Sequence, residues 1–179
     1  MTLYRNRERF SKLSVNVGIA FSKIPLSANQ WTLLTLVPTV VALWFLVQER
    51  FLWAAVLFLV ASFIDVVDGA VARVTGTTSK LGAYLDTVVD RYVEGIIVFG
   101  LLFAALPDWL LPVRAWIVLY LFGAMMTTYA KAAAKEKELT GDKELKGGLL
   151  ERAERLIILF IGILAAAWNP LWLTYVLAL

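Results

Sequence analysis

Residues 51–74, FLWAAVLFLVASFIDVVDGAVARV, form a long apolar run with two acidic residues near its end. A helix needs about 20 mostly apolar residues to cross a bilayer, and this run is long enough. Carboxylates inside a membrane are costly, rare and commonly functional. The run therefore predicts a membrane-spanning helix in which Asp65 and Asp68 have a specific task.

The composition agrees with a membrane protein. The chain has 179 residues and is 60% hydrophobic, whereas about half apolar is ordinary for soluble domains. Candidate spans lie near residues 28–48, 51–73, 80–106, 110–134, 149–167 and 169–179. We expect an all-α, integral membrane bundle of six transmembrane helices. Because the last run covers only about half a bilayer by helix rise, we expect the natural chain to continue beyond Leu179.

The N-terminal region differs from these runs. Within residues 3–24, apolar side chains recur at helical spacing between mostly basic and polar ones, which is typical of an amphipathic helix lying at a membrane surface. Pro25 ends this helix, and Ser27 with Gln30 forms a predicted capping box for the next one. We therefore divide the chain into an interfacial helix, residues 1–26, and a single transmembrane catalytic domain, residues 27–179.

The basic residues indicate how the chain is oriented. Of the 17 lysines and arginines, 15 lie on one side of the predicted membrane spans. Only Arg50 and Arg114 lie near the ends of the spans on the other side. The positive-inside rule places the basic side, and with it the N-terminus, in the cytoplasm. We expect a multi-pass protein of the plasma membrane with its active site facing the cytoplasm, and no nucleic-acid partner.

The chain contains no cysteine and no histidine. This excludes disulfides, thiolate nucleophiles and the usual zinc and haem ligands, and it removes the commonest general base. Acid–base chemistry then falls mainly to Asp or Glu. Any metal ion would be bound through oxygen, which favours magnesium, manganese or calcium.

A second pair of acidic residues follows in the next run. Asp86 and Asp90 come shortly after the connection TGTTSK, residues 75–80, which is short enough to make an antiparallel helical hairpin. The i, i+3 and i, i+4 spacings put each pair on one helix face, at a similar depth of about 10 Å below the interface. Four such carboxylates cannot all ionise unaided, so protons or divalent cations must neutralise them.

These residues carry a family resemblance. The pattern comprises Asp65, Asp68, Gly69, Ala72, Arg73, Gly82, Asp86 and Asp90. Its residues and spacings resemble the signature of the CDP-alcohol phosphatidyltransferase family. That resemblance implies transfer of a substituted phosphate from a CDP-linked lipid to the hydroxyl of a second alcohol, with release of CMP. It also implies two divalent ions, Mg²⁺ or Mn²⁺, and a homodimer.

The resemblance assigns roles to individual residues. It implies that Asp65, Asp68 and Asp86 are metal ligands, and that Asp90 is the general base and also touches a metal. Gly69, Ala72, Arg73 and Gly82 would hold the cytidine and its phosphates. Asn29 stands where family members often have an asparagine near the site, although it also suits helix capping.

The second half of the chain bears on the acceptor. TYAKAAAKEKE, residues 128–138, and GLLERAERLIIL, residues 148–159, resemble the branch that makes phosphatidylinositol phosphate or archaetidylinositol phosphate. Lys131, Arg152 and Arg155 would then bind the phosphate of inositol phosphate, unless they only snorkel at helix ends. The donor is open between CDP-diacylglycerol and CDP-archaeol, and glycerol phosphate or serine is the alternative acceptor. An Asp-rich intramembrane prenyltransferase and a cation or proton transporter are the alternative classes.

Overall fold

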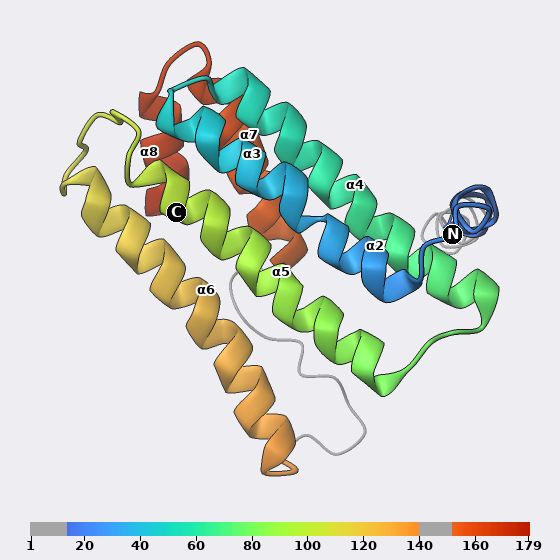
Figure 1. The fold of residues 1–179 in the computed structure, drawn as a ribbon. Coiled ribbons are helices and arrows are strands. Elements are labelled where there is room, and N and C mark those ends of the chain that lie inside the picture. Colours follow the sequence, from blue (N-terminus) through green and yellow to red (C-terminus); the bar gives the residue numbers. More distant parts are fainter. Residues whose placement is uncertain (1–13, 140–151) are drawn as a thin grey trace, which may run out of the picture. The chain divides into compact units, whose positions relative to one another are not determined.

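The computed structural model describes residues 14–139 and 152–179, and their regular structure is entirely helical (Figure 1). Its helices are α2 (Ala28–Leu34), α3 (Leu36–Val47), α4 (Phe51–Thr75), α5 (Lys80–Leu101), α6 (Val113–Glu136), α7 (Arg152–Ala166) and α8 (Leu171–Ala178). The prediction of an all-α protein is confirmed. The described residues form two compact units, one of residues 14–42 and Val56–Ile96 and the other of Leu43–Ala55 with 97–139 and 152–179.

Within residues 14–139 and 152–179, three helical stretches are long and apolar enough to cross a membrane by length and composition. They are Ala28–Val47, Phe51–Thr75 and Val113–Glu136. The first consists of two helices, since α2 ends at Leu34 and α3 begins at Leu36. Pro38 explains the break, because its ring collides with the carbonyl four residues earlier and it has no N–H to donate. The Thr35 hydroxyl donates to the Thr32 carbonyl at 2.6 Å, which satisfies part of the interrupted backbone.

The first unit has a hydrophobic core that joins the N-terminal segment to α2 and α4. Its buried centre is Trp31, Val67 and Val71, and Val17, Phe21, Leu26, Leu34 and Ile64 pack around it. Residues 14–21 are helical, in agreement with the predicted amphipathic helix, whose earlier part lies outside the described residues. The Phe21 ring meets Trp31 edge-on at 5.5 Å between centroids. This helix is therefore packed against α2 and α4 through specific side chains.

The predicted capping box opens α2. The Gln30 N–H donates to Ser27 Oγ at 3.3 Å, and the Ser27 N–H donates to Gln30 Oε1 at 2.8 Å. These two bonds satisfy backbone donors that the first helical turn leaves without partners. The cap fixes where α2 starts and therefore which of its residues face α4 and α5.

Residues 76–79 connect α4 to α5 in a tight hairpin (Figure 1). Gly76 has a φ of 65°, and the Thr77 N–H donates to the Ala72 carbonyl at 3.0 Å. Together they close the end of α4 in the manner of a glycine C-terminal motif. Ser79 Oγ accepts from the Gly82 N–H at 3.0 Å, which caps the start of α5. The hairpin predicted from residues 75–80 is thus built by local turn chemistry.

Inside α5 lies a buried ion pair. Glu94 is 0% exposed, and its Oε2 lies 3.2 Å from Arg91 Nη1. An unpaired charge in such surroundings would be strongly unfavourable, whereas a paired and hydrogen-bonded one is tolerated. Glu94 lies one turn beyond Asp90, so α5 is polar well into its length on the face that carries its acidic residues.

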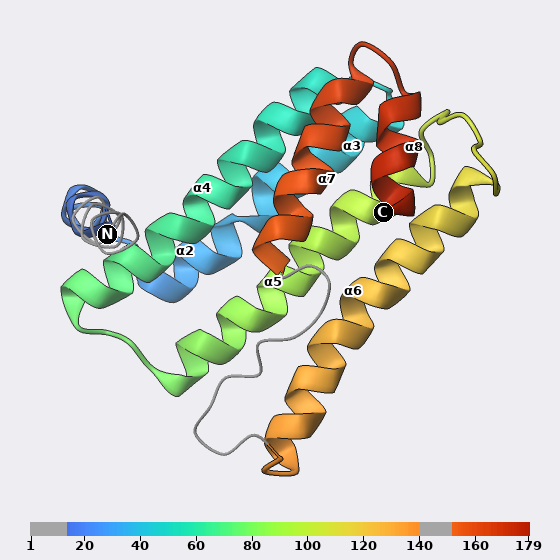
Figure 2. The ribbon, with the colours of Figure 1, turned by 180° about the vertical axis from the view of Figure 1, so that it is seen from behind.

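In the second unit, α7 and α8 lie side by side (Figure 2). Their contact buries Leu159, Ile163 and Leu173 completely. The Thr174 hydroxyl donates to the Pro107 carbonyl at 2.8 Å, which ties α8 to the segment before α6. These helices lie within the residues of the predicted spans near 149–167 and 169–179, but neither is among the three stretches long and apolar enough to cross a membrane, so both spans stay predictions.

Candidate active site

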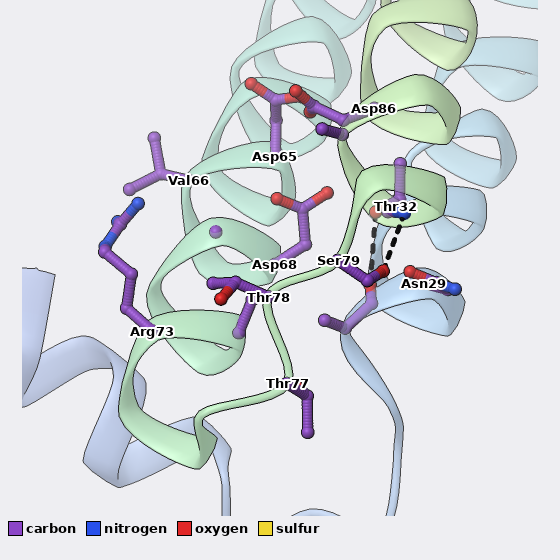
Figure 3. Close-up of a pocket in the computed structure, with 15 residues that line it drawn as sticks. Asn29, Thr32, Asp65, Val66, Asp68, Arg73, Thr77, Thr78, Ser79 and Asp86 are labelled. Atoms are coloured by element: carbon purple, nitrogen blue, oxygen red, sulfur yellow. Dashed lines mark hydrogen bonds between the residues drawn. The ribbon is translucent and has the colours of Figure 1, made fainter.

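Three carboxylates converge where α4 and α5 face each other near the hairpin (Figure 3). Asp65 and Asp68 come from α4, and Asp86 comes from the second turn of α5. Each offers a carboxylate oxygen, and these oxygens lie within 4.8 Å of one another. The i, i+3 spacing puts the α4 pair on one face, and the short hairpin brings Asp86 opposite it. The predicted cluster is therefore assembled for three of its four members.

Asp68 is the most buried member of this cluster. It is 5% exposed, and within the described part of the chain its Oδ2 atom is buried without a hydrogen-bond partner. Leaving a buried oxygen of this kind unsatisfied is costly. A divalent cation bound by carboxylate oxygens would satisfy it and offset the mutual repulsion of the three acids. The residues present fit a hard cation with oxygen ligands.

A cavity of about 410 Å³ opens beside the carboxylates. Its lining comprises Ala28, Asn29, Thr32, Asp65, Val66, Asp68, Gly69, Ala72, Arg73, Thr77, Thr78, Ser79, Gly82, Ala83 and Asp86. Every residue assigned to the nucleotide lies on this wall, as does Asn29. Figure 3 shows Asp65 and Asp86 at one end of the cavity and Thr77 at the other, with Asp68, Thr78 and Ser79 between them. The site thus has a cluster of negative charge next to a polar pocket whose wall also carries the cation Arg73.

Several lining hydroxyls were not predicted from the sequence. Thr77, Thr78 and Ser79 belong to the hairpin loop, and Thr32 lies on α2 one turn after Asn29. Their signal in the sequence is weak, because Ser and Thr are ordinary turn residues. The run of three hydroxyl residues beside the motif was the available clue, since hydroxyls at such a position also suit phosphate and sugar groups.

Asn29 faces the cavity and does not cap α2. Ser27 is the N-cap, so the helix-capping role considered for Asn29 is wrong. A Cβ placed on Gly82 would lie 3.2 Å from Asn29 Oδ1 and 3.2 Å from Ser79 Oγ. Gly82 is therefore the point at which α5 leaves room for the side chain of Asn29.

We expect Gly82→Val to raise the KM for the CDP-linked lipid that the family resemblance implies at least about tenfold, because the branched side chain must displace Asn29 or Ser79. Gly95→Val is the matched control, since a Cβ on Gly95 meets no described atom within 4 Å. Steady-state CMP release with varied CDP-lipid measures the effect. An unchanged KM in the folded Gly82→Val protein would show that the contact of α5 with Asn29 does not shape the nucleotide site.

The other predicted residues lie as follows. Asp90 is 8% exposed and stands one turn beyond Asp86 on α5, outside the group of three converging oxygens. Lys131 lies on α6 and is exposed, whereas Arg152 and Arg155 lie on α7 and are half-buried. These three cations belong to the second unit, while the carboxylate cluster belongs to the first. The roles of all four residues stay predictions.

The family comparison agrees with this site. A model of the CDP-alcohol phosphatidyltransferase family matches residues 26–179. The chain belongs to this family, so it is a transferase of phospholipid biosynthesis and a membrane protein. The predicted enzyme class is confirmed, and it replaces the prenyltransferase and the transporter considered as alternatives.

Characterised relatives carry more specific names. The chain is 33% identical over 146 residues to an archaetidylinositol phosphate synthase of Pyrococcus horikoshii. The aligned region covers 82% of this chain and 73% of the relative. It is 35% identical over 149 residues to a phosphatidylinositol phosphate synthase of Corynebacterium glutamicum, covering 79% of this chain and 64% of the relative. The chain therefore spans about two thirds to three quarters of these relatives' lengths.

Solved structures share the fold. Phosphatidylinositol phosphate synthase of Mycobacterium tuberculosis with CDP-DAG bound superposes with a TM-score of 0.77 at 24% identity, covering 93% of this chain and 85% of that one. The same enzyme in complex with manganese and citrate gives a TM-score of 0.80 at 24% identity, covering 92% of this chain and 80% of that one. At this level of identity the likeness establishes the fold.

Proposed function

We propose that this protein transfers the lipid phosphate of a CDP-linked lipid to the hydroxyl of inositol phosphate and releases CMP. The observation that carries the proposal is the group of three carboxylate oxygens within 4.8 Å beside a nucleotide-sized cavity. Relatives named as inositol phosphate synthases support the choice of acceptor. Because these relatives include archaetidyl and phosphatidyl enzymes, CDP-archaeol and CDP-diacylglycerol both stand as donors.

The proposed reaction is a single displacement at phosphorus. The acceptor oxygen forms a bond to the lipid-side phosphorus, the bond from that phosphorus to the CMP oxygen breaks, and Asp90 takes the hydroxyl proton. In our proposal Asp65, Asp68 and Asp86, with Asp90 touching one ion, hold two Mg²⁺ or Mn²⁺ ions. When bound, such ions stabilise charge on the transferred and leaving phosphates. The manganese complex of the Mycobacterium tuberculosis enzyme supports an ion of this class.

The cavity walls suit the donor's nucleotide. We assign Arg73 to a phosphate of the CDP group, because a guanidinium matches phosphate oxygens in charge and geometry. The cavity has space beside Arg73 because the neighbouring residues of α4 and α5 have small or no side chains. These residues are Gly69, Ala72 and Gly82. Asn29 supplies an amide at the same wall, facing the space where the cytidine would lie.

We propose the following setting in the membrane. Residues 27–179 form the transmembrane catalytic domain with six spans, and residues 1–26 lie along the cytoplasmic surface. In this proposal the protein lies in the plasma membrane. Its N-terminus and its active site face the cytoplasm. The predominance of basic residues on one side supports this orientation. The protein acts as a homodimer in this proposal, which cross-linking in native membranes tests.

One assay tests the proposed reaction. Purified full-length protein receives CDP-diacylglycerol or CDP-archaeol, magnesium, and in turn inositol phosphate, glycerol phosphate or serine, and CMP is measured. We expect CMP release with inositol phosphate alone. Release with glycerol phosphate or serine instead would keep the reaction class and overturn the acceptor. Absence of CMP in every combination would contradict the proposed function altogether.

We assign the acceptor's phosphate to Lys131, Arg152 and Arg155. Arg155→Gln should then raise the KM for inositol phosphate about 10- to 100-fold, because one charged partner of the phosphate is lost. The KM for the CDP-lipid should stay within about twofold in the same variant, since this cation does not touch the nucleotide. Lys137→Gln serves as the matched control, because Lys137 is an exposed cation of α6's end. Equal KM values in the two variants would indicate that Arg155 only snorkels.

A further inference from the structure

The guanidinium of Arg73 is held in one place by groups from two helices. A Cβ on Gly69 would lie 3.2 Å from Arg73 Nη1, so the side chain turns back over the helix turn that carries Gly69. Arg73 Nη2 also donates to Ser14 Oγ at 2.7 Å, across 59 residues of sequence. A flexible exposed arginine is thus given a defined direction along the cavity wall.

Ser14 holds this guanidinium without neutralising it. A hydroxyl accepts a hydrogen bond but carries no charge, whereas a carboxylate in its place would form an ion pair. The positive charge of Arg73 therefore stays available for an anionic ligand, while the rotamer entropy of a long side chain is partly lost before that ligand arrives.

Close packing of the N-terminal segment keeps Ser14 in reach. A Cβ on Gly18 would lie only 2.6 Å from the Ala70 carbonyl oxygen and 2.6 Å from Val74 Cγ2, so residues 14–21 approach α4 as closely as a glycine permits. Val17 is partly buried beside it, and Phe21 packs on Trp31. The distance from Ser14 to Arg73 is therefore set by a helix contact with no room for a side chain at residue 18.

We propose that Ser14 is a positioning residue of the nucleotide site, which orients Arg73 toward the diphosphate of the CDP-lipid, and that Gly18 sets its distance. The N-terminal helix is then a part of the active site as well as a membrane-surface element. This inference rests on the proposed function, because it takes the ligand of Arg73 to be that diphosphate.

Replacements of Ser14 by Ala and by Asp test the inference. We expect Ser14→Ala to raise the Kd and KM for the CDP-lipid about three- to tenfold, with kcat within about twofold of wild type. Ser14→Asp should weaken binding further, because its carboxylate competes with the diphosphate for the guanidinium. A merely structural role would give the opposite order, since the carboxylate introduced by Ser14→Asp would keep the bond that docks the helix.

Matched controls separate this effect from general damage. Ser22 lies on the same segment and its hydroxyl donates to the Ile19 carbonyl, so Ser22→Ala and Ser22→Asp should leave the Kd for the CDP-lipid unchanged. In an Arg73→Gln background, Ser14→Ala should have no further effect, as a coupled pair requires. Gly18→Val should lower CDP-lipid affinity at least as much as Ser14→Ala, with its melting temperature in detergent measured in parallel.

The outcomes are distinguishable from failure of the proposed function. If the wild-type protein neither binds a CDP-lipid nor releases CMP with any acceptor, the function itself is overturned. If wild type is active and Ser14→Asp binds the CDP-lipid as wild type does, only the role of Ser14 is overturned. The role of Ser14 would also be overturned if Ser14→Ala lowered the affinity for the CDP-lipid equally in the wild-type and Arg73→Gln backgrounds.

Discussion

Replacing Asp68 with Asn is expected to lower CMP release by about 10³-fold or more. Asn has nearly the same shape, but it lacks the negative charge and one of the two carboxylate oxygens. Asp68 is the buried member of the cluster, and its Oδ2 has no hydrogen-bond partner within the described structure. The substitution therefore removes a proposed ligand of the divalent cation while it leaves the packing of α4 almost unchanged.

Metal binding provides the decisive measurement for this variant. Titration with Mn²⁺ in detergent should show tight binding to wild type and at least about tenfold weaker binding to Asp68→Asn. Glu136→Gln is the matched control, because it removes one acidic charge from an exposed position that lies 3.4 Å from Lys137 Nζ. Wild-type Mn²⁺ affinity in Asp68→Asn would mean that the three carboxylates do not form the metal site.

The convergence of the three carboxylates was predictable because it depends on short-range rules. Helical periodicity alone puts Asp65 and Asp68 on one face. Turn chemistry alone makes residues 76–79 a tight connection, so Asp86 must return at a similar depth. The capping box at Ser27 is likewise local, and its two hydrogen bonds are present. Nothing in this part of the site requires knowledge of distant contacts.

The contributions from other elements were not predictable in the same way. Thr32 enters the cavity because α2 lies against α4 and α5, and that placement depends on the packing of Trp31 with Val67 and Val71. The bond from Arg73 to Ser14 depends on the close approach at Gly18. Sequence periodicity indicates which face of a helix is apolar, but it does not say which helix that face meets.

Asp90 differs in position from the other three acidic residues of the motif. It shares a helix face with Asp86, one turn away, but it lies outside the group of three converging oxygens. It is also 8% exposed, so water has little access to it. A carboxylate in this position suits a general base, because the proton of the acceptor hydroxyl has no histidine to accept it in this chain.

Asp90→Asn should therefore lower kcat by about 10²- to 10⁴-fold while the Kd for the CDP-lipid stays close to that of wild type. The affinity for Mn²⁺ should fall much less than in Asp68→Asn, because three ligands remain in place. A loss of Mn²⁺ affinity as large as that of Asp68→Asn would instead make Asp90 chiefly a metal ligand and leave the hydroxyl proton to another acceptor.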